Sequence, residues 1–202
     1  MSSIQAMDRS YATLKRMICE GCYPPGHRLE ANRLAQELGV SMTPVRDVLH
    51  RLVGERLVRA SSGEGFHVPR LTEKALRDLY EWNAALLSLA TRTARRPLAD
   101  SDLPPLRDVP AGADRVAALF ARLASAAPNA EIADAVAGAS DRLHAYRMVE
   151  PQVLLPDAHE LDDVALAGPG QAQAIRRYHL RRMRHAAALL EARERGFAPA
   201  RL

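Results

Sequence analysis

Residues 39–58, GVSMTPVRDVLHRLVGERLV, decide how this chain is interpreted. Ser41 is expected to cap a helix here, and Pro44 stands in the first turn, where a missing N–H costs nothing. The apolar positions have the spacing of one buried helix face: Val45, Val48, Leu49, Leu52 and Val53. The opposite face is polar and partly basic: Thr43, Arg46, Asp47, His50 and Arg51. Such a helix fits the major groove of DNA, although an ordinary surface helix has the same pattern.

The flanking residues favour the DNA-binding interpretation. A helix is predicted from Asp8 or Ser10 to Glu20, and a second over residues 31–38, which Gly39 ends. Two short helices, a glycine turn and a capped third helix are typical of a helix-turn-helix. Beyond Gly54, strands are predicted over residues 57–60 and 66–68, joined by the turn SSGEG. Residues 27–29 could form a further extended piece. The sequence thus predicts a winged helix-turn-helix over residues 8–70.

Composition and charge agree with this prediction. Of the 202 residues 48% are hydrophobic and 4% aromatic, which favours a helical core. No apolar run reaches membrane-spanning length and the first residues do not resemble a signal peptide, so a cytoplasmic protein without membrane contact is expected. Cys19 and Cys22 are the only cysteines, and no second ligand pair accompanies them. Residues 1–70 hold 10 basic and 7 acidic side chains, against 18 and 17 in residues 71–202. The excess positive charge therefore lies in the predicted DNA-binding part.

Residues 73–202 predict an all-helical bundle, which makes the whole chain mainly α. Thr72 is expected to cap a long helix that reaches Arg96, and a proline-rich irregular stretch follows over residues 97–112. Further helices are predicted over residues 113–126, 129–149, 157–167 and 171–195. His179 falls in the inward apolar stripe of the last helix. A buried histidine needs a polar partner, so it is either a hydrogen-bonded core residue or a contact to a metal or effector.

Three motifs together closely resemble the DNA-binding domain of GntR-family bacterial transcriptional regulators: PPG-x-x-L, LAQELGVSMTPVRDVLHRLVGERLV and G-x-GF-x-V. The resemblance covers residues 11–68 without a gap. It implies that Arg46 contacts base edges, that Thr43 contacts a phosphate or base, and that Gly63 and Gly65 form the wing tip. His50 and Arg51 lie on the same helix face, and Arg51 could reach a phosphate.

Three departures from the family pattern point to tuned DNA affinity. Met42 follows the serine of the turn, where the family usually has arginine. Asn32 takes another usual arginine position, with Arg33 beside it, and Glu64 stands between the wing glycines. Each change removes or opposes a phosphate contact, so we expect weaker or differently tuned binding.

The helical order of residues 73–202 resembles the FCD effector domain of the FadR-type branch. That resemblance implies a divalent metal, held by an aspartate and three histidines, that helps bind a carboxylate. His159 and His179 match two of these positions, whereas Ala117 and Ala121 occupy the other two and cannot bind metal. Asn83 stands where arginine is usual and Leu87 where glutamate is common. The effector or metal candidates are therefore Asn83, His159 and His179.

Asp162 and Asp163 could complete a weak metal site with the two histidines. With half of the inherited ligand set missing, a ligand held by hydrogen bonds, or no ligand, is favoured over a close copy of the metal site.

The expected function is that of a homodimeric, sequence-specific regulator, a ligand-responsive repressor that binds an inverted-repeat operator on double-stranded DNA. The helical domain would dimerise and sense a small-molecule effector. One alternative is a DNA-binding dimer whose C-terminal domain has lost ligand and metal binding. A second is a metal-dependent enzyme using His159 and His179, although the chain has no nucleophile elbow, P-loop, dinucleotide-binding glycine pattern or H-E-x-x-H motif. A third is a protein-interaction module whose winged helix contacts protein.

Overall fold

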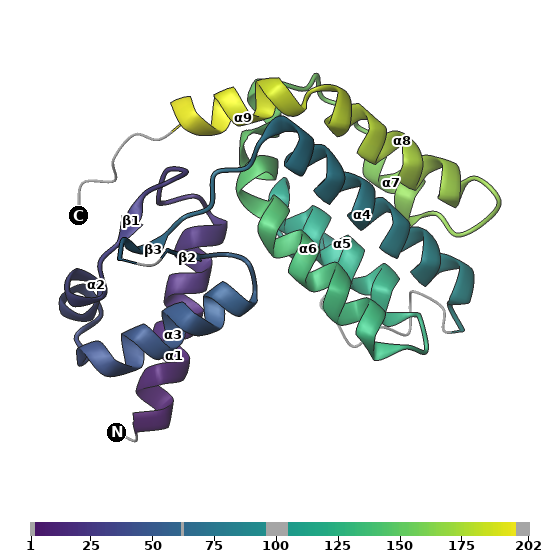
Figure 1. Ribbon diagram of the computed structural model, residues 1–202. Helices are drawn as coiled ribbons and strands as arrows, with labels where there is room; N and C mark the ends of the chain where they lie inside the picture. The colour runs from purple at the N-terminus through teal and green to yellow at the C-terminus, as the bar shows by residue number, and fades with distance from the viewer. Residues whose placement is uncertain (1–2, 62, 96–104, 197–202) are drawn as a thin grey trace. The chain divides into compact units, whose positions relative to one another are not determined.

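The computed structural model describes residues 3–61, 63–95 and 105–196, and it divides the chain into two compact units (Figure 1). Unit 1 comprises Met1–Arg70 and Arg193–Leu202, and unit 2 comprises Leu71–Ala192. Unit 1 combines helices with a small sheet, whereas the described part of unit 2 is helical throughout. The fold class is therefore mainly α, as the sequence predicts. Within the described residues, no helix is both long and apolar enough to cross a membrane.

Unit 1 is built around α3 (Met42–Gly54), on which α1 (Ser3–Cys19) and α2 (Ala31–Leu38) both pack. Its core consists of the apolar faces of these helices and of residues beside the wing: Leu14, Ile18, Leu29, Leu34, Ala35, Val45, Val48, Leu49, Leu52, Leu57, Val58 and Val68. Removing each large aliphatic side chain of this kind from water contributes about 1.5–3 kcal/mol. The apolar face of α3 therefore packs in this core and holds the helix-turn-helix in place.

Two local expectations about the helices of unit 1 were wrong. α1 begins at Ser3 instead of Asp8 or Ser10, and Ser10 is buried inside the helix. No glycine or proline interrupts residues 3–10, so nothing in that stretch stops the helix. Ser41 does take the extended N-cap conformation before α3, but its side chain accepts no capping hydrogen bond.

The wing has three strands instead of the predicted two. β1 (Arg28–Leu29), β3 (Gly65–His67) and β2 (Arg59–Ser61) pair antiparallel in that order. The extended piece expected at residues 27–29 is thus an edge strand of the same sheet. The strand predicted over residues 57–60 begins two residues later, because Leu57 and Val58 donate their N–H groups to Leu52 O at 3.0 and 3.2 Å and close the end of α3.

Unit 2 is a helical bundle formed by α4 (Glu73–Thr93), α5 (Ala113–Ser125), α6 (Ala130–Val149), α7 (Glu160–Ala165) and α8 (Gln171–Arg184). α4 lies between α8 on one side and the pair α5 and α6 on the other (Figure 1). Two 3-10 helices, η2 (Leu106–Asp108) and η3 (Glu150–Gln152), precede α5 and follow α6. α9 (Ala186–Arg195) continues beyond α8. Because α4 has helices on both sides, its polar side chains can be buried in the core of unit 2.

The sequence placed the helices of unit 2 correctly but missed several ends. Thr72 caps α4 by accepting from Ala75 N at 3.2 Å, as expected, but α4 ends at Thr93. Arg96, and residues 97–104 of the predicted irregular stretch, lie outside the described residues. α7 is shorter than predicted, because Asp157 Oδ1 accepts from His159 N in a turn that replaces the first helical residues.

The last predicted helix is in fact two helices, α8 and α9. The break falls at His185, which takes a non-helical backbone conformation and donates its N–H to carbonyl groups at the end of α8. No glycine or proline marks this position, so the pattern of residues 171–195 gives no sign of the break.

Candidate functional site

The apolar residues that α3 buries determine which of its residues remain exposed. Val45, Val48, Leu49 and Leu52 are buried, so Thr43, Arg46, Asp47, His50 and Arg51 are exposed. Gly39 ends α2 in a left-handed conformation (φ 65°), which glycine adopts at no steric cost. This turn directs the chain from α2 into α3. The residues that the sequence singles out for DNA contact thus lie together on one open helix face.

Arg46 and Thr43 are the side chains best placed to contact a ligand from this face. They lie three residues apart, about one helical turn, and both are exposed. Arg46 forms no ion pair within the described residues. Its planar guanidinium can therefore offer two parallel N–H groups to guanine O6 and N7 without first breaking a contact within the protein.

The other three basic candidates are already engaged within unit 1. Arg51 lies over the Tyr11 ring at 3.5 Å and pairs with Glu55 at 3.4 Å. His50 packs edge-on against Phe66 of β3, with 5.0 Å between ring centroids. Arg33 pairs with Glu37 at 2.8 Å, and hydrogen bonding to that carboxylate raises the pKa of Arg33. His50 thus links α3 to the wing, and each of the two arginines already has an acidic partner on its own helix or at its end.

The wing tip depends on its two glycines. Gly63 and Gly65 have φ values of 81° and 84°, in the region that L side chains rarely adopt. Glu64 lies between them, exposed, and donates its N–H to Ser61 O at 3.2 Å. The tip is therefore narrow and carries one acidic side chain, as the sequence implies.

The sheet also carries a basic row that the sequence reasoning missed. Arg28 of β1 and Arg59 of β2 both lie opposite His67 of β3. Residues paired across strands point to the same face of a sheet, and both arginines are exposed. The missed signal was the short extended piece at residues 27–29, which was predicted but not paired with the wing.

Unit 2 carries a buried polar cluster that includes two of the three effector candidates. Asn83 of α4 and His179 of α8 are 0% and 1% exposed. His179 Nδ1 lies 2.7 Å from Ile175 O, and its Nε2 lies 3.0 Å from the Asn83 side-chain amide. The ring stacks on Phe120 of α5 at 5.6 Å. Burial and, less strongly, the charges of Arg147 and Arg182 outweigh the hydrogen bond to Ile175 and lower the pKa of His179 to about 3. The imidazole is therefore neutral at pH 7.

Arg147 of α6 is the member of this cluster that sequence reasoning did not place. In the sequence, Arg142, His144 and Arg147 fit a contact with an anionic ligand and a solvated helix face equally well, and the structure shows Arg147 only 2% exposed. Its Nη2 lies 3.5 Å from Asn83 Oδ1, and its guanidinium lies 5.0 Å from the centre of the Phe120 ring. Arg147 Nε and Nη1 and Asn83 Nδ2 have no hydrogen-bond partner within the described residues. No local pattern indicates that Arg147 is buried, because arginine on a helix is usually exposed.

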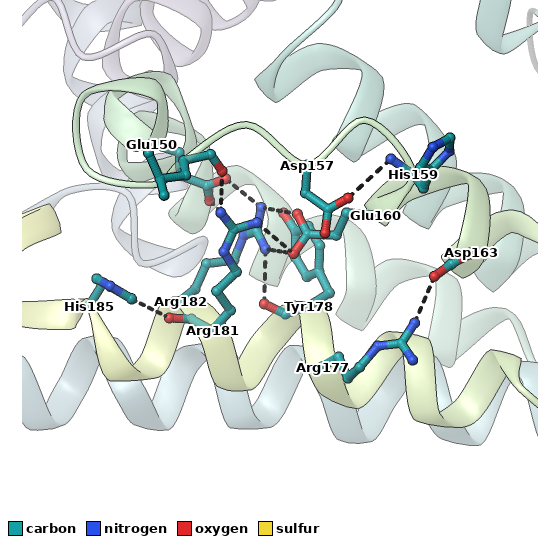
Figure 2. A network of polar contacts seen from close by, with 11 residues as sticks. Glu150, Asp157, His159, Glu160, Asp163, Arg177, Tyr178, Arg181, Arg182 and His185 are labelled. Atoms are coloured by element: carbon teal, nitrogen blue, oxygen red, sulfur yellow. Dashed lines mark hydrogen bonds and ion pairs between the residues drawn. The ribbon is translucent and has the colours of Figure 1, made fainter.

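The second buried arginine, Arg182 of α8, has the partners that Arg147 lacks (Figure 2). Its guanidinium donates to Glu150 at 2.8 and 3.0 Å and to Glu160 at 2.8 and 2.9 Å. It also lies 3.3 Å above the Tyr178 ring. Burial opposes its charge, but Tyr178 and the two carboxylates outweigh that effect and raise the pKa of Arg182. This network joins η3, α7 and α8 and is structural in character.

The structure does not gather the predicted metal donors. His159 is exposed beside Asp157 (Figure 2), whereas His179 is buried with both ring nitrogens engaged. Asp163 pairs with Arg177 at 2.7 Å. Across residues 3–61, 63–95 and 105–196, no three His, Cys, Asp or Glu side chains lie together as metal ligands would. The donor set therefore does not fit a divalent metal.

Comparisons with known proteins agree with the geometry. The family model "Bacterial regulatory proteins, gntR family" matches residues 7–68. The Nta operon transcriptional regulator of Aminobacter aminovorans is 30% identical over 142 residues, which cover 64% of this chain and 68% of that protein. The transcriptional repressor GlaR of Escherichia coli is 32% identical over 92 residues, 44% of this chain and 41% of that one. Apart from the Nta regulator, the chain spans half or less of the length of the curated relatives it matches.

The fold has a counterpart among solved structures. A GntR transcriptional regulator from Rhodococcus sp. RHA1 superimposes with a TM-score of 0.72 at 19% identity, over 90% of this chain and 97% of that one. At this identity the likeness concerns the fold alone. The relatives and the fold are those of DNA-binding transcriptional regulators, which excludes the interpretation of His159 and His179 as an enzyme site. The chain belongs to the GntR family of bacterial regulatory proteins.

Proposed function

We propose that the protein is a sequence-specific regulator that binds an inverted-repeat operator as a homodimer and represses transcription until a small-molecule effector binds. Residues 8–70 would read DNA in the cytoplasm. Residues 73–202 would dimerise and sense the effector, as in an FCD-like domain. The observation that carries the proposal is the exposed face of α3, where Arg46 has no ion pair within the described residues. The relative GlaR is named a transcriptional repressor, which supports repression over activation.

The proposed reading mechanism divides the work between two surfaces. Arg46 would bond bidentately to a guanine in the major groove, with Thr43 beside it on a base or phosphate. Arg28 and Arg59 on the wing would neutralise backbone phosphates and offset Glu64. A two-fold dimer presents two such heads, so the operator would repeat with the matching symmetry and spacing.

The test starts from an operator selected out of a random duplex pool with the full-length protein. Arg46→Ala should weaken binding to this operator by about 1–3 kcal/mol, roughly 5- to 150-fold, and relax the preference at one base pair. Arg59→Ala should weaken binding to all sequences alike and lower the slope of log affinity against log salt by about 1.8, the value for two lost phosphate contacts, one from each subunit of the dimer. Fluorescence anisotropy across a salt series measures both effects.

Arg16→Ala is the matched control, because Arg16 is exposed on α1, is paired with Glu20 at 3.4 Å, and carries the same charge. It should leave base preference unchanged. An Arg46→Ala variant that keeps wild-type affinity and preference would remove Arg46 from the reading surface. Binding of the wild-type protein to duplex DNA that does not depend on salt would favour a protein-interaction module instead.

A further inference from the structure

Arg147 of α6 is a buried cation without a counter-charge in the described part of the chain. It is 2% exposed and forms no ion pair with a described residue. Its contacts are one long approach of 3.5 Å to Asn83 Oδ1 and the Phe120 ring at 5.0 Å. A guanidinium stays protonated in proteins, so Arg147 cannot escape burial by losing its charge. Burying an uncompensated charge is strongly unfavourable.

The same bundle shows how this chain neutralises a guanidinium that has only a structural role. Arg182 is 4% exposed, and it is met by both oxygens of Glu150 and both oxygens of Glu160. Unit 2 thus holds two buried arginines, of which Arg182 pairs with two carboxylates and Arg147 pairs with none among the residues that the structure describes. This contrast shows that no described residue neutralises Arg147 as Glu150 and Glu160 neutralise Arg182.

Several buried hydrogen-bond donors of unit 2 have no acceptor within the described residues. Arg147 Nε and Nη1, the Asn83 amide nitrogen and the Ser140 hydroxyl are buried and unpartnered within the described residues. Ser140 lies two turns before Arg147 on the same face of α6. Asn83 Oδ1 lies 3.5 Å from Arg147 Nη2, and His179 Nε2 lies 3.0 Å from the Asn83 side-chain amide. A water molecule could fill some of these hydrogen bonds, but only an anion fills them and also balances the charge.

We propose that Arg147 and Asn83 form a metal-independent site for a compact oxyanion, either a carboxylate group or an inorganic oxyanion. This proposal rests on the proposed function, because it names the class of effector that the C-terminal domain senses. Arg147 supplies the positive charge that the family resemblance assigns to a metal ion. Asn83 fixes the orientation of the guanidinium, and His179 holds Asn83 in turn from α8.

Thermal unfolding of the full-length protein tests the site. The probes are sodium formate, acetate and lactate in one arm and sodium phosphate and sulfate in the other, at constant ionic strength. The neutral amides formamide, acetamide and lactamide are the matched control ligands. At about a hundred times the dissociation constant, a bound anion should raise Tm by about 5–10 °C, and the amides should not. A response to one arm only tells which oxyanion class the site takes. If neither arm raises Tm above its control, the proposal is overturned.

Two variants locate the response. Arg147→Met removes the buried charge, so it should abolish the anion-induced rise and leave the unliganded protein as stable as wild type or more so. Arg142→Gln removes the same charge from a partly exposed position of α6 and should keep the response. If Arg147→Met responds like wild type, or lowers the unliganded Tm and keeps the rise, Arg147 is a structural residue and the site is wrong.

A readout on the wild-type protein covers the case in which Arg147→Met does not fold. The ring signals of His179 in a nuclear magnetic resonance spectrum should move with the effective anion and not with its amide, because His179 and Arg147 share Asn83. Unmoved signals at a saturating Tm shift would place the anion elsewhere and overturn the proposal. DNA binding measured without added anion is independent of these results. If the protein binds its operator but shows no anion response, the proposed function stands and the anion site is wrong. If it shows the anion response but does not bind an operator, the anion site stands and the proposed function is wrong.

Discussion

At the scale of single residues, arginine has different roles at different positions of this chain. Arg46 is exposed without an ion pair in the described part of the chain, Arg51 packs on Tyr11, and Arg182 is buried between two glutamates. All three lie on helices. Their roles differ because burial and partners differ, and burial is a property of the packed helices.

His179 makes the stability of unit 2 depend on pH. Burial beside the cations Arg147 and Arg182 lowers its folded pKa to about 3, from an ordinary value near 6.5 in the unfolded chain. Below about pH 6 the unfolded state therefore binds the proton more readily, and the free energy of unfolding falls as the pH drops toward 3. This group should contribute a slope of about 1.4 kcal/mol per pH unit in that window.

Chemical unfolding between pH 7 and pH 4 measures this slope. His179→Phe keeps an aromatic ring against Phe120 and removes the titrating group, so its stability should vary less with pH than that of wild type. Tyr80 and Tyr178 also face the ring, but both hydroxyls have raised pKa values and stay neutral throughout the window. Equal slopes in wild type and variant would show that His179 does not titrate on unfolding.

At the scale of secondary-structure elements, the short helix α7 is held by ion pairs more than by its length. It has six residues, and its Glu160 meets Arg182 of α8 and, at 3.4 Å, Arg181 (Figure 2). So short a helix is not stable by itself. Its position in the bundle therefore depends on the side-chain contacts it makes with α8.

Arg182→Met should lower the free energy of unfolding by about 3–5 kcal/mol, because it leaves Glu150 buried without its cation and Glu160 with only the more distant Arg181. Arg177→Met on the same helix breaks the exposed pair with Asp163 and should cost at most about 1 kcal/mol. Urea unfolding curves of the two variants measure the difference. Equal losses would mean that the buried network contributes no more than a surface ion pair.

At the scale of the whole molecule, the proposed regulator needs two reading heads. Native mass spectrometry of the purified protein should give a species of twice the 22.2 kDa chain mass, and the selected operator should contain an inverted repeat. Binding to a single half-site should be much weaker, because the DNA-binding domain of the second subunit then has no half-site beside it to bind. A monomer that binds half-site and full site equally would refute the two-headed operator.

The sequence by itself determined the winged helix-turn-helix and the helical nature of the rest. These follow from local physics: the spacing of apolar residues on α3, the left-handed turn at Gly39 and the cap at Thr72 each depend on a few neighbouring residues. The exposed position of Arg46 also followed, because the buried face of an amphipathic helix fixes its opposite face.

Only the tertiary structure decided what depends on residues far apart in the chain. The third strand of the wing needs Arg28–Leu29 to meet Gly65–His67, and no local pattern specifies that pairing. The separation of His159 from His179 and the break at His185 are likewise set by how the helices pack. The contrast between Arg147 and Arg182 has the same origin, because a carboxylate neutralises a buried arginine only where packing brings the two together.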